Sequence, residues 1–357
     1  MRPQGEGKAG DVSNAGSGCV STPRQRERLY VHVARRLTPE QRARLQELLD
    51  PRITVTDGET DSVSPNTEIL VSGLPTQKEL SAYAMLQALI IPWASVPQST
   101  RQVVGQFPNI AVHNLHHNAA TTAELAITLL LAVAKQVIPV DRALRRNDWS
   151  SCLDPSANPL LDEWTIVLLG YGAVGQRIAR ACLGLGMRVI ALRRHSSRPA
   201  EMQEGLEVRP SEALHDSLPE ANGLIVALPL TRETHAMIGK AELELLSARA
   251  ILVNVARAQI VDEEALYESL RTHRLGGAGL DVWYQEPTRD ELERGVRIPM
   301  SRFPFQELDN VVMSPHRGGA LGERMIELRR MDELASLLNA FIRGESMPNR
   351  VRRDLWY

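Results

Sequence analysis

The sequence has few cysteines, and it lacks long apolar runs. Its three cysteines, Cys19, Cys152 and Cys182, stand far apart and form no CxxC pair. This spacing argues against a disulfide framework or a cysteine-based zinc site, so we expect a reducing, cytoplasmic setting and no bound metal. No apolar run reaches the roughly 18 residues that predict a membrane-spanning helix.

Aromatic residues and excess charge of one sign are also scarce. Lys and Arg number 41 against 43 Asp and Glu, for a net charge of -2, and aromatic residues make up 4% of the chain. Binding to nucleic acid or to an anionic membrane requires a basic surface, and base stacking requires rings. We therefore expect neither kind of partner. Residues 1–27 are rich in Gly, Ser and charge without an apolar segment, which predicts a disordered leader and not a signal peptide.

Strand-like runs alternate with helical patterns in the first third of the remaining chain. A helix is predicted to begin after Thr38, which is followed by proline at the first helical position. Such alternation predicts a parallel sheet covered by helices on both faces, as in a small flavodoxin-like domain. The predicted strands are 29–34, 52–55, 68–71, 88–91 and 110–112, and further helices are predicted at 77–85 and 99–106.

The rest of the chain predicts a second domain of similar plan. One long helix over 120–146 is expected to connect the two domains, and an amphipathic helix over 323–342 is expected to return to the first. The fold class predicted is α/β, with two Rossmann-like or flavodoxin-like domains on parallel sheets. The substrate domain would be discontinuous, with residues 28–117 plus 320–357, and residues 118–319 would form the dinucleotide-binding domain. Further strands are predicted at 187–192, 223–227, 250–254, 277–282 and 311–314.

The stretch 165–179 is an apolar run that breaks into a GxGxxG sequence and continues as a helix. In such a turn the first glycine allows a tight bend, the second lets backbone N–H groups approach a pyrophosphate, and the third allows close packing of helix on strand. The helix that follows directs its positive end toward the phosphates. The residues predicted to hold the dinucleotide here are Gly170, Tyr171, Gly172, Ala173, Val174 and Gly175.

The end of the next strand predicts which dinucleotide binds. An acidic residue about 20 positions after the glycines would bind the adenosine ribose 2′-hydroxyl and select NAD. The sequence has Arg193, Arg194 and Ser196 in this region instead. Guanidinium groups bind phosphate through two parallel hydrogen bonds, so the region favours NADP, as NADPH, over NAD. The alternative is a solvated basic strand end that also accepts NAD.

Four segments, in this order, resemble the D-isomer-specific 2-hydroxyacid dehydrogenase family. The resemblance implies an NAD(P)-dependent enzyme that interconverts a small 2-oxoacid and a D-2-hydroxyacid, with glyoxylate/hydroxypyruvate reductases and phosphoglycerate dehydrogenases among its relatives. It also implies a homodimer built on the cofactor domain. The segments are GYGAVG at 170–175, LPLTRETH at 228–235, LVNVARAQIVD at 252–262 with GAGLDV at 277–282, and NVVMSPHRGG at 310–319.

The resemblance implies a catalytic set of Arg257, Glu286 and His316, and the chemistry of these residue types agrees. An arginine offers a planar fork that grips a carboxylate and polarises a ketone. A histidine can donate the proton that the reduced oxygen needs. A carboxylate beside the imidazole would stabilise its protonated form and fix its orientation. A packed or capping histidine and a surface arginine are the plain alternatives.

Further residues are predicted to line the cofactor and the substrate. Asp281 resembles the family aspartate that holds the nicotinamide amide. Arg317 replaces the small residue usual after the catalytic histidine, and it either faces outward or brings a second positive charge toward the substrate. The other cofactor residues predicted are Leu228, Pro229, Thr234, Val255 and His316 itself, and the substrate residues are Ser72, Ala94, Ser95, Val96, Asn118, Arg257 and Arg317.

These residues favour an NADPH-preferring reductase of the glyoxylate/hydroxypyruvate type. One alternative is an oxidoreductase that acts on a phosphonate or another phosphorus acid, suggested by Arg317. Another is a dinucleotide-sensing, corepressor-like binding protein, against which the retained catalytic set argues, since a sensor needs no proton donor.

Overall fold

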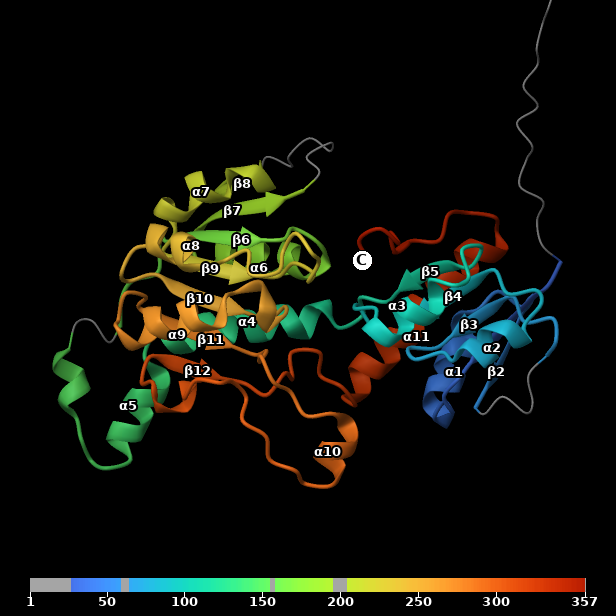
Figure 1. Cartoon of the computed structure of the whole chain (residues 1–357), viewed down its shortest axis with the longest axis horizontal. Coiled ribbons are helices and arrows are strands. Elements are labelled where there is room, and N and C mark those ends of the chain that lie inside the picture. The colour runs from blue at the N-terminus through green and yellow to red at the C-terminus, as the bar shows by residue number, and fades with distance from the viewer. Residues whose placement is uncertain (1–26, 59–63, 155–157, 195–203, 357) are drawn as a thin grey trace, which may run out of the picture.

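The strands of the protein form two separate parallel sheets, as the computed structural model shows for residues 27–58, 64–154, 158–194 and 204–356 (Figure 1). The predicted leader lies outside these residues apart from its last one. The two sheets lie side by side along the long axis of the molecule, so the α/β class with two parallel sheets is confirmed.

The first sheet has five strands in the order β2-β1-β3-β4-β5, which is the flavodoxin-like order. Thr38 caps the first helix, because its side chain accepts a hydrogen bond from Gln41 N while the Gln41 side chain accepts one from Thr38 N. The strands are Leu29–Val33 (β1), Ile53–Asp57 (β2), Ile69–Val71 (β3), Ala88–Ile91 (β4) and Ala111–Asn114 (β5), and the helices are Pro39–Leu48 (α1), Gln77–Ala82 (α2) and Gln98–Val104 (α3).

The second sheet has seven strands in the order β12-β11-β10-β9-β6-β7-β8. The chain therefore reverses direction across the sheet between β6 and β9, which is the position where doubly wound folds bind dinucleotides. The predicted strands are present, and β8 is a strand that the prediction missed. The strands are Thr165–Leu169 (β6), Arg188–Arg193 (β7), Leu206–Pro210 (β8), Gly223–Val226 (β9), Ile251–Asn254 (β10), Gly277–Leu280 (β11) and Val311–Met313 (β12).

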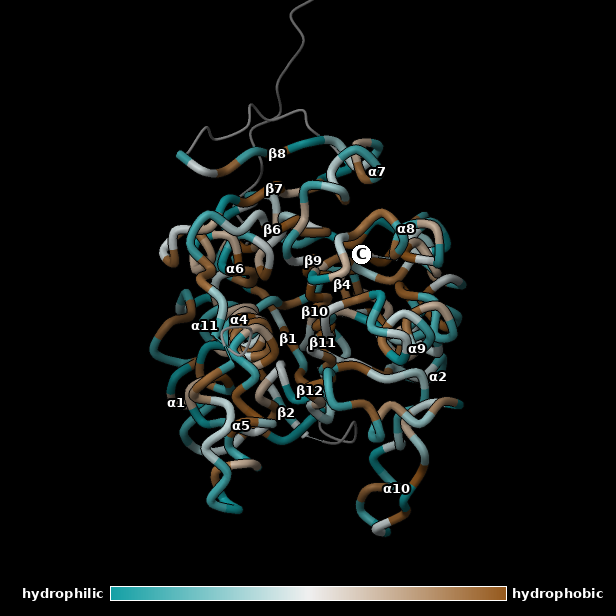
Figure 2. The backbone as a smooth tube through the Cα atoms, turned by 90° about the vertical axis from the view of Figure 1, so that its left-hand side faces the viewer, coloured by the Kyte–Doolittle hydropathy of each residue, from teal (hydrophilic) through white to brown (hydrophobic). Residues whose placement is uncertain are grey.

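Both faces of this sheet are buried. Along β6, Ile166 and Leu168 belong to one apolar core while Val167 and Leu169 belong to the other, as expected for a parallel sheet with helices on both sides. In Figure 2 the hydrophobic colour follows the central strands, including β9 and β10. The helices of this part are Ala119–Ala134 (α4), Val137–Leu144 (α5), Ala173–Gly184 (α6), Leu214–Ser217 (α7), Lys240–Leu245 (α8), Glu263–Arg271 (α9) and Arg289–Glu293 (α10).

The predicted single helix over 120–146 is wrong, because the chain breaks between α4 and α5 with a bend of 59°. Gln136 lies in the left-handed region at φ 47°. Pro139 explains the break, since its ring would clash with the carbonyl of Lys135 in a continuous helix and it has no N–H to donate there. Among the described residues, no single helix is long and apolar enough to cross a membrane, although the bent pair would pass that test together.

The last helix, Arg324–Ile342 (α11), packs beside α1 under the first sheet (Figure 1). Its buried residues Met331, Leu334 and Leu338 share an apolar core with Leu29 and Val31 of β1. The C-terminal helix therefore contributes to the core of the N-terminal sheet, although the two segments are far apart in the sequence.

Glu327 of α11 is the centre of a charged cluster. Its Oε2 accepts hydrogen bonds from Arg35 Nη2 at 2.8 Å, Gln41 Nε2 at 3.0 Å and Arg330 Nη1 at 2.6 Å. Arg330 also donates from Nε to Nε2 of His117, which precedes α4, at 3.2 Å. Burial acting alone would raise the pKa of Glu327, but the hydrogen bond from Arg35 and the charges of Arg330 and Arg35 hold it below its ordinary value.

We expect the Glu327→Gln variant to lose about 3 kcal/mol of free energy of unfolding at neutral pH, because it leaves the buried Arg330 without its counter-charge. A lowered pKa in the folded state stabilises the protein above the pKa of the unfolded chain. The difference between wild type and variant should therefore shrink as the pH falls below 4.5. Urea unfolding measured at several pH values tests this. The control is Glu40→Gln, which breaks an exposed ion pair with Arg324. This variant should lose less than about 1 kcal/mol of free energy of unfolding. Equal losses in the two variants would contradict the prediction.

Candidate active site

The glycine turn lies at the carboxyl end of β6 and leads into α6. Gly170 has φ 100°, and a Cβ there would lie 2.6 Å from Ala227 O. A Cβ on Gly175 would lie 2.0 Å from Gly170 O, whereas one on Gly172 would meet nothing within 4 Å. The first and third glycines are thus required by the protein's own packing. The second borders open space at the first turn of α6, where no side chain caps the N–H groups. This geometry fits a dinucleotide pyrophosphate.

The other predicted residues of this turn lie around the glycines. Ala173 is exposed and begins α6, while the partly buried Tyr171 and Val174 pack against the core between the sheet, α4 and α6. At the end of β7, Arg193 and Arg194 are half-buried, and Arg194 Nη2 forms an ion pair with Glu233 Oε2 at 2.9 Å. Ser196 lies outside the described residues.

The loop after β9 carries the next group of predicted cofactor residues. Leu228 is half-buried and Pro229 is exposed. Thr234 is buried, and its hydroxyl donates to Pro229 O at 2.7 Å while accepting from Thr231 N at 2.8 Å. The Thr234 side chain therefore holds the loop in shape. Val255 is buried at the carboxyl end of β10, the neighbouring strand.

His316 and Glu286 form a pair. The His316 Nδ1 atom lies 2.7 Å from Glu286 Oε2, and Glu286 Oε1 accepts a hydrogen bond from Trp283 N at 3.0 Å. The His316 side chain remains 40% exposed, so a substrate can reach the ring. His316 also has φ 50°, in the left-handed region, which L side chains rarely adopt.

The surroundings of Glu286 favour its ionised form. Burial acting alone would raise its pKa, but the hydrogen bonds from His316 and Trp283 N, together with the charges of His316 and Arg257, bring it below the ordinary value. Glu286 is therefore a carboxylate at neutral pH, and it can hold a protonated imidazole.

Arg257 follows β10 in a turn built by Asn254. The Asn254 side chain accepts from Ala256 N and donates to Arg257 O, each at 3.0 Å, while Arg257 Nη1 donates to Ala256 O at 2.6 Å. Burial lowers the pKa of the Arg257 guanidinium, the charge of Glu286 raises it, and the charge of Arg101 lowers it. The structure thus brings Arg257, Glu286 and His316 within electrostatic reach of one another.

Asp281, predicted to hold the nicotinamide amide, is buried at the end of β11 with 1% exposure. Its carboxylate accepts hydrogen bonds from Ser314 Oγ, from Arg317 N at 2.9 Å and from Gly318 N at 2.9 Å. The aspartate therefore contacts the turn that carries His316.

The predicted substrate residues of the first domain lie at the carboxyl ends of its strands. Ser72 follows β3 and is buried; after β4, Ala94 is exposed, Ser95 is half-buried and Val96 is buried. Asn118 directly precedes α4, and its amide lies against Gly319, where an added Cβ would be 2.9 Å from Asn118 Nδ2. The Arg317 side chain is exposed.

Arg101 is a candidate active-site residue that no sequence pattern predicted. It lies in α3 and donates from Nε to Val96 O at 2.9 Å, so its side chain folds back onto the loop after β4. Its charge reaches Arg257 of the other domain. No local pattern could reveal this, because the two arginines are brought together only by the packing of separate domains.

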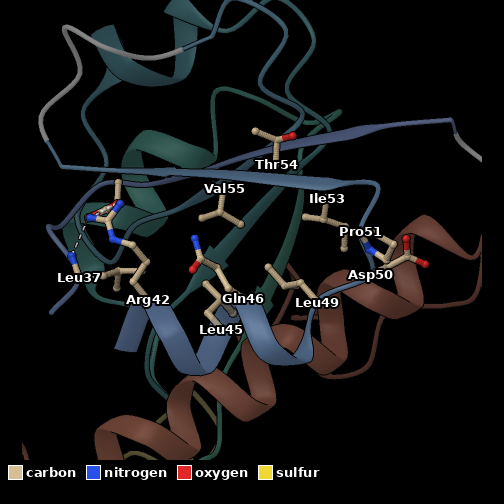
Figure 3. A pocket seen from close by; sticks show the side chains of 11 residues that line it. Leu37, Arg42, Leu45, Gln46, Leu49, Asp50, Pro51, Ile53, Thr54 and Val55 are labelled. Carbon is tan, nitrogen blue, oxygen red and sulfur yellow. Dashed lines mark hydrogen bonds and ion pairs between the residues drawn. The ribbon is translucent and has the colours of Figure 1, made fainter. Parts of the chain in front are cut away.

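Two further observations concern other kinds of site. A hollow of about 290 Å³ lies between α1 and β2 (Figure 3). It is lined by Leu45, Ile53 and the Arg42–Asp57 ion pair, and by none of the predicted site residues. Within the described ranges, no three His, Cys, Asp or Glu side chains gather in a way that could hold a metal ion.

Comparison with known proteins identifies the family. A model of the NAD-binding domain of the D-isomer specific 2-hydroxyacid dehydrogenases matches residues 127–318. A glyoxylate reductase of Korarchaeum cryptofilum is 36% identical over 237 residues, which cover 66% of this chain and 67% of the relative. A glyoxylate reductase of Pyrococcus horikoshii is 36% identical over 242 residues, 66% of each chain.

Solved structures share the two-domain fold. A D-isomer specific 2-hydroxyacid dehydrogenase of Xanthobacter autotrophicus, in complex with NADPH and MES, has a TM-score of 0.74 at 23% identity and covers 93% of this chain and 100% of its own. An NADPH-dependent glyoxylate/hydroxypyruvate reductase of Sinorhizobium meliloti has a TM-score of 0.73 at 21% identity. The match covers 92% of this chain and 100% of the reductase chain. The chain belongs to the D-isomer specific 2-hydroxyacid dehydrogenase family. It is an NAD(P)-binding oxidoreductase similar to glyoxylate reductases.

Proposed function

We propose that the protein reduces a small 2-oxoacid of the glyoxylate or hydroxypyruvate type to the 2-hydroxyacid, with NADPH as the preferred cofactor. The pairing of His316 with Glu286, within electrostatic reach of Arg257, is the observation that carries this proposal. It combines a proton donor, its orienting carboxylate and a carboxylate-binding cation.

In this proposal each residue has one task. Arg257 binds the substrate carboxylate and polarises the ketone oxygen. His316 delivers a proton to that oxygen, and Glu286 balances the charge of the imidazolium. A dinucleotide whose pyrophosphate is bound at the glycine turn would supply, from its nicotinamide, the hydride that C2 accepts. Oxidation of the hydroxyacid is the reverse, and closure of the two domains would exclude water.

The test is loss of the reduced-nicotinamide absorbance with glyoxylate, hydroxypyruvate, pyruvate, oxaloacetate and phosphonopyruvate. Turnover of glyoxylate or hydroxypyruvate with the highest kcat/KM supports the proposal. A preference for phosphonopyruvate would instead favour a phosphorus-containing substrate. Cofactor binding without turnover of any acid would contradict the proposed activity and favour a dinucleotide sensor.

The cofactor preference rests on the basic end of β7. If Arg193 binds the 2′-phosphate, the Arg193→Ala variant should weaken NADPH binding by roughly 10-fold or more, since a charge-assisted hydrogen bond contributes about 1.5–3 kcal/mol. Binding of NADH, which lacks that phosphate, should not change. Fluorescence titration of both cofactors measures this, with Arg188→Ala at the exposed start of the same strand as the control. Equal losses for the two cofactors would contradict the phosphate role.

We also propose a homodimer that works in the cytoplasm. Trp149, Leu153 and Leu160, which all follow α5, are 67, 89 and 78% exposed, and large apolar side chains gathered on one segment favour contact with another chain. The free thiols of Cys152 and Cys182 agree with a reducing compartment. Sedimentation analysis of the wild type and of the Trp149→Glu variant tests the dimer.

A further inference from the structure

Asp281 contacts the turn that carries His316 through both its backbone and its side chain. β11 and β12 are neighbours in the sheet, and this turn, residues 314–318, begins directly after β12. His316 N donates to Asp281 O at 2.7 Å. The Asp281 carboxylate accepts from Ser314 Oγ, Arg317 N and Gly318 N. One buried residue therefore takes hydrogen bonds from both sides of His316.

The turn has a conformation that needs such support. His316 is left-handed at φ 50°, which is unfavourable for an L residue and persists only where the surroundings enforce it. Gly318 is packed so closely that an added Cβ would lie 2.8 Å from Asp281 Oδ2. From the other side, Thr122 Oγ1 of α4 donates to Gly318 O at 3.1 Å.

The same short segment also holds the partner of His316. Trp283 Nε1 donates to Ser314 O at 2.9 Å, and Trp283 N donates to Glu286 Oε1 at 3.0 Å. Residues 281–286 therefore fix both halves of the pair. Asp281 and Trp283 hold the histidine turn, and Trp283 orients the glutamate.

We propose that Asp281 is a positioning residue, whose buried carboxylate holds the 314–318 turn in the left-handed shape that directs the His316 imidazole to Glu286. This inference rests on the proposed function for its kinetic consequence, but the positioning itself exists without cofactor. The three donors to the carboxylate belong to the protein's own chain, so the turn is held whether or not the remaining lone pair of Oδ2 also accepts a hydrogen bond from the nicotinamide amide. The positioning role is thus additional to the amide contact that the family resemblance implies.

Two variants remove the support in different ways. Asp281→Asn keeps the shape but replaces one acceptor oxygen by a donor, which opposes a main-chain N–H of the turn. Ser314→Ala removes only the hydroxyl donor and leaves Asp281 in place. Ser217→Ala is the matched control, because Ser217 is also buried in the same domain, and its hydroxyl donates to Ala213 O at 2.8 Å and accepts from Arg209 Nη1 at 3.0 Å, away from the site.

We expect kcat at saturating NADPH to fall by roughly 10- to 100-fold in Asp281→Asn and by less in Ser314→Ala, as for other residues that orient a catalytic group. The pH profile of kcat should change in both variants, and the Kd of Ser314→Ala for NADPH should match the wild type. Ser217→Ala should keep both the wild-type pH profile and kcat. A raised Kd for NADPH with unchanged kcat in Asp281→Asn would overturn the proposal, as would a Ser314→Ala variant that behaves like Ser217→Ala.

A second measurement separates this proposal from the proposed function. In the cofactor-free protein, the ¹⁵N resonances of the His316 ring report its hydrogen bond to Glu286, with Glu286→Gln as the reference for a lost carboxylate partner. We expect Asp281→Asn to move these resonances toward those of the reference. Wild-type resonances in Asp281→Asn would overturn the positioning role whatever the substrate. An enzyme inactive on every acid, but with the expected resonances, would contradict only the proposed function.

Discussion

His316→Gln should lower kcat for the preferred 2-oxoacid by roughly 10²- to 10⁴-fold, the usual contribution of a positioned general acid. Glutamine can still donate a hydrogen bond to the ketone, so the KM for the acid should change much less than kcat. It cannot transfer a proton, so the oxygen that becomes the alkoxide is left without its donor. Stopped-flow measurement of cofactor oxidation, at saturating NADPH, separates this chemical step from product release.

The chain supplies a matched control for this variant. His215 forms a second histidine–glutamate pair, with Nε2 at 2.8 Å from Glu242 Oε1, and lies on α7. Its substitution by glutamine should leave kcat unchanged. A similar loss in His215→Gln would mean that the effect is general destabilisation, and full activity of His316→Gln would remove His316 from the mechanism.

Glu286→Gln should have a smaller effect than loss of the histidine. The variant lacks the carboxylate that balances the charge of the imidazolium, and we expect kcat to fall by roughly 10- to 100-fold, by analogy with the partners that orient metal-ligating histidines. Because the pKa of Glu286 lies below its ordinary value, this carboxylate does not titrate near neutral pH. Any change in wild-type kcat between slightly acidic and slightly basic pH therefore arises from a group other than Glu286.

Local sequence patterns predict the glycine turn and the two parallel sheets. The glycine turn is recognisable because its spacing reflects three separate demands on the backbone, of which the two packing demands appear as close approaches at Gly170 and Gly175. The parallel sheets followed from apolar strands that alternate with helices. The proline that separates α4 from α5 stands in the sequence at position 139, but the prediction of one continuous helix rested on apolar spacing alone.

What could not be predicted depends on contacts between distant segments. The left-handed His316 is enforced by Asp281, 35 positions earlier in the chain, and no residue near position 316 signals it. The charge of Arg101 in α3 acts on Arg257 of the other domain, and its side chain is held there by a hydrogen bond to the loop after β4. The strand β8 has only partial burial beyond Leu206, so its apolar pattern is weak at the edge of the sheet.

The third glycine of the turn provides the second large effect, because its α-hydrogen faces the backbone of Gly170. In the Gly175→Ala variant the new methyl group would lie 2.0 Å from Gly170 O, and neither backbone segment can move without separating α6 from β6. We expect a loss of about 3 kcal/mol, from overpacking at a site that cannot relax, and NADPH binding weakened by roughly 100-fold as the turn shifts. Thermal unfolding and fluorescence titration measure the two effects.

Two other glycines of the same region show whether the effect is local. Gly184, in the last turn of α6, has nothing within 4 Å of an added Cβ. Because alanine favours the helix, Gly184→Ala should keep or raise the melting temperature. It should also bind NADPH as the wild type does. Gly172 is equally open in the protein alone, but a methyl group there enters the space proposed for the pyrophosphate. Gly172→Ala should therefore melt like wild type and still bind NADPH weakly. If Gly172→Ala bound NADPH as wild type does, the phosphates could not lie against this turn. Stability lost only at Gly175, with affinity lost at both Gly172 and Gly175, would separate the packing role of the turn from its binding role.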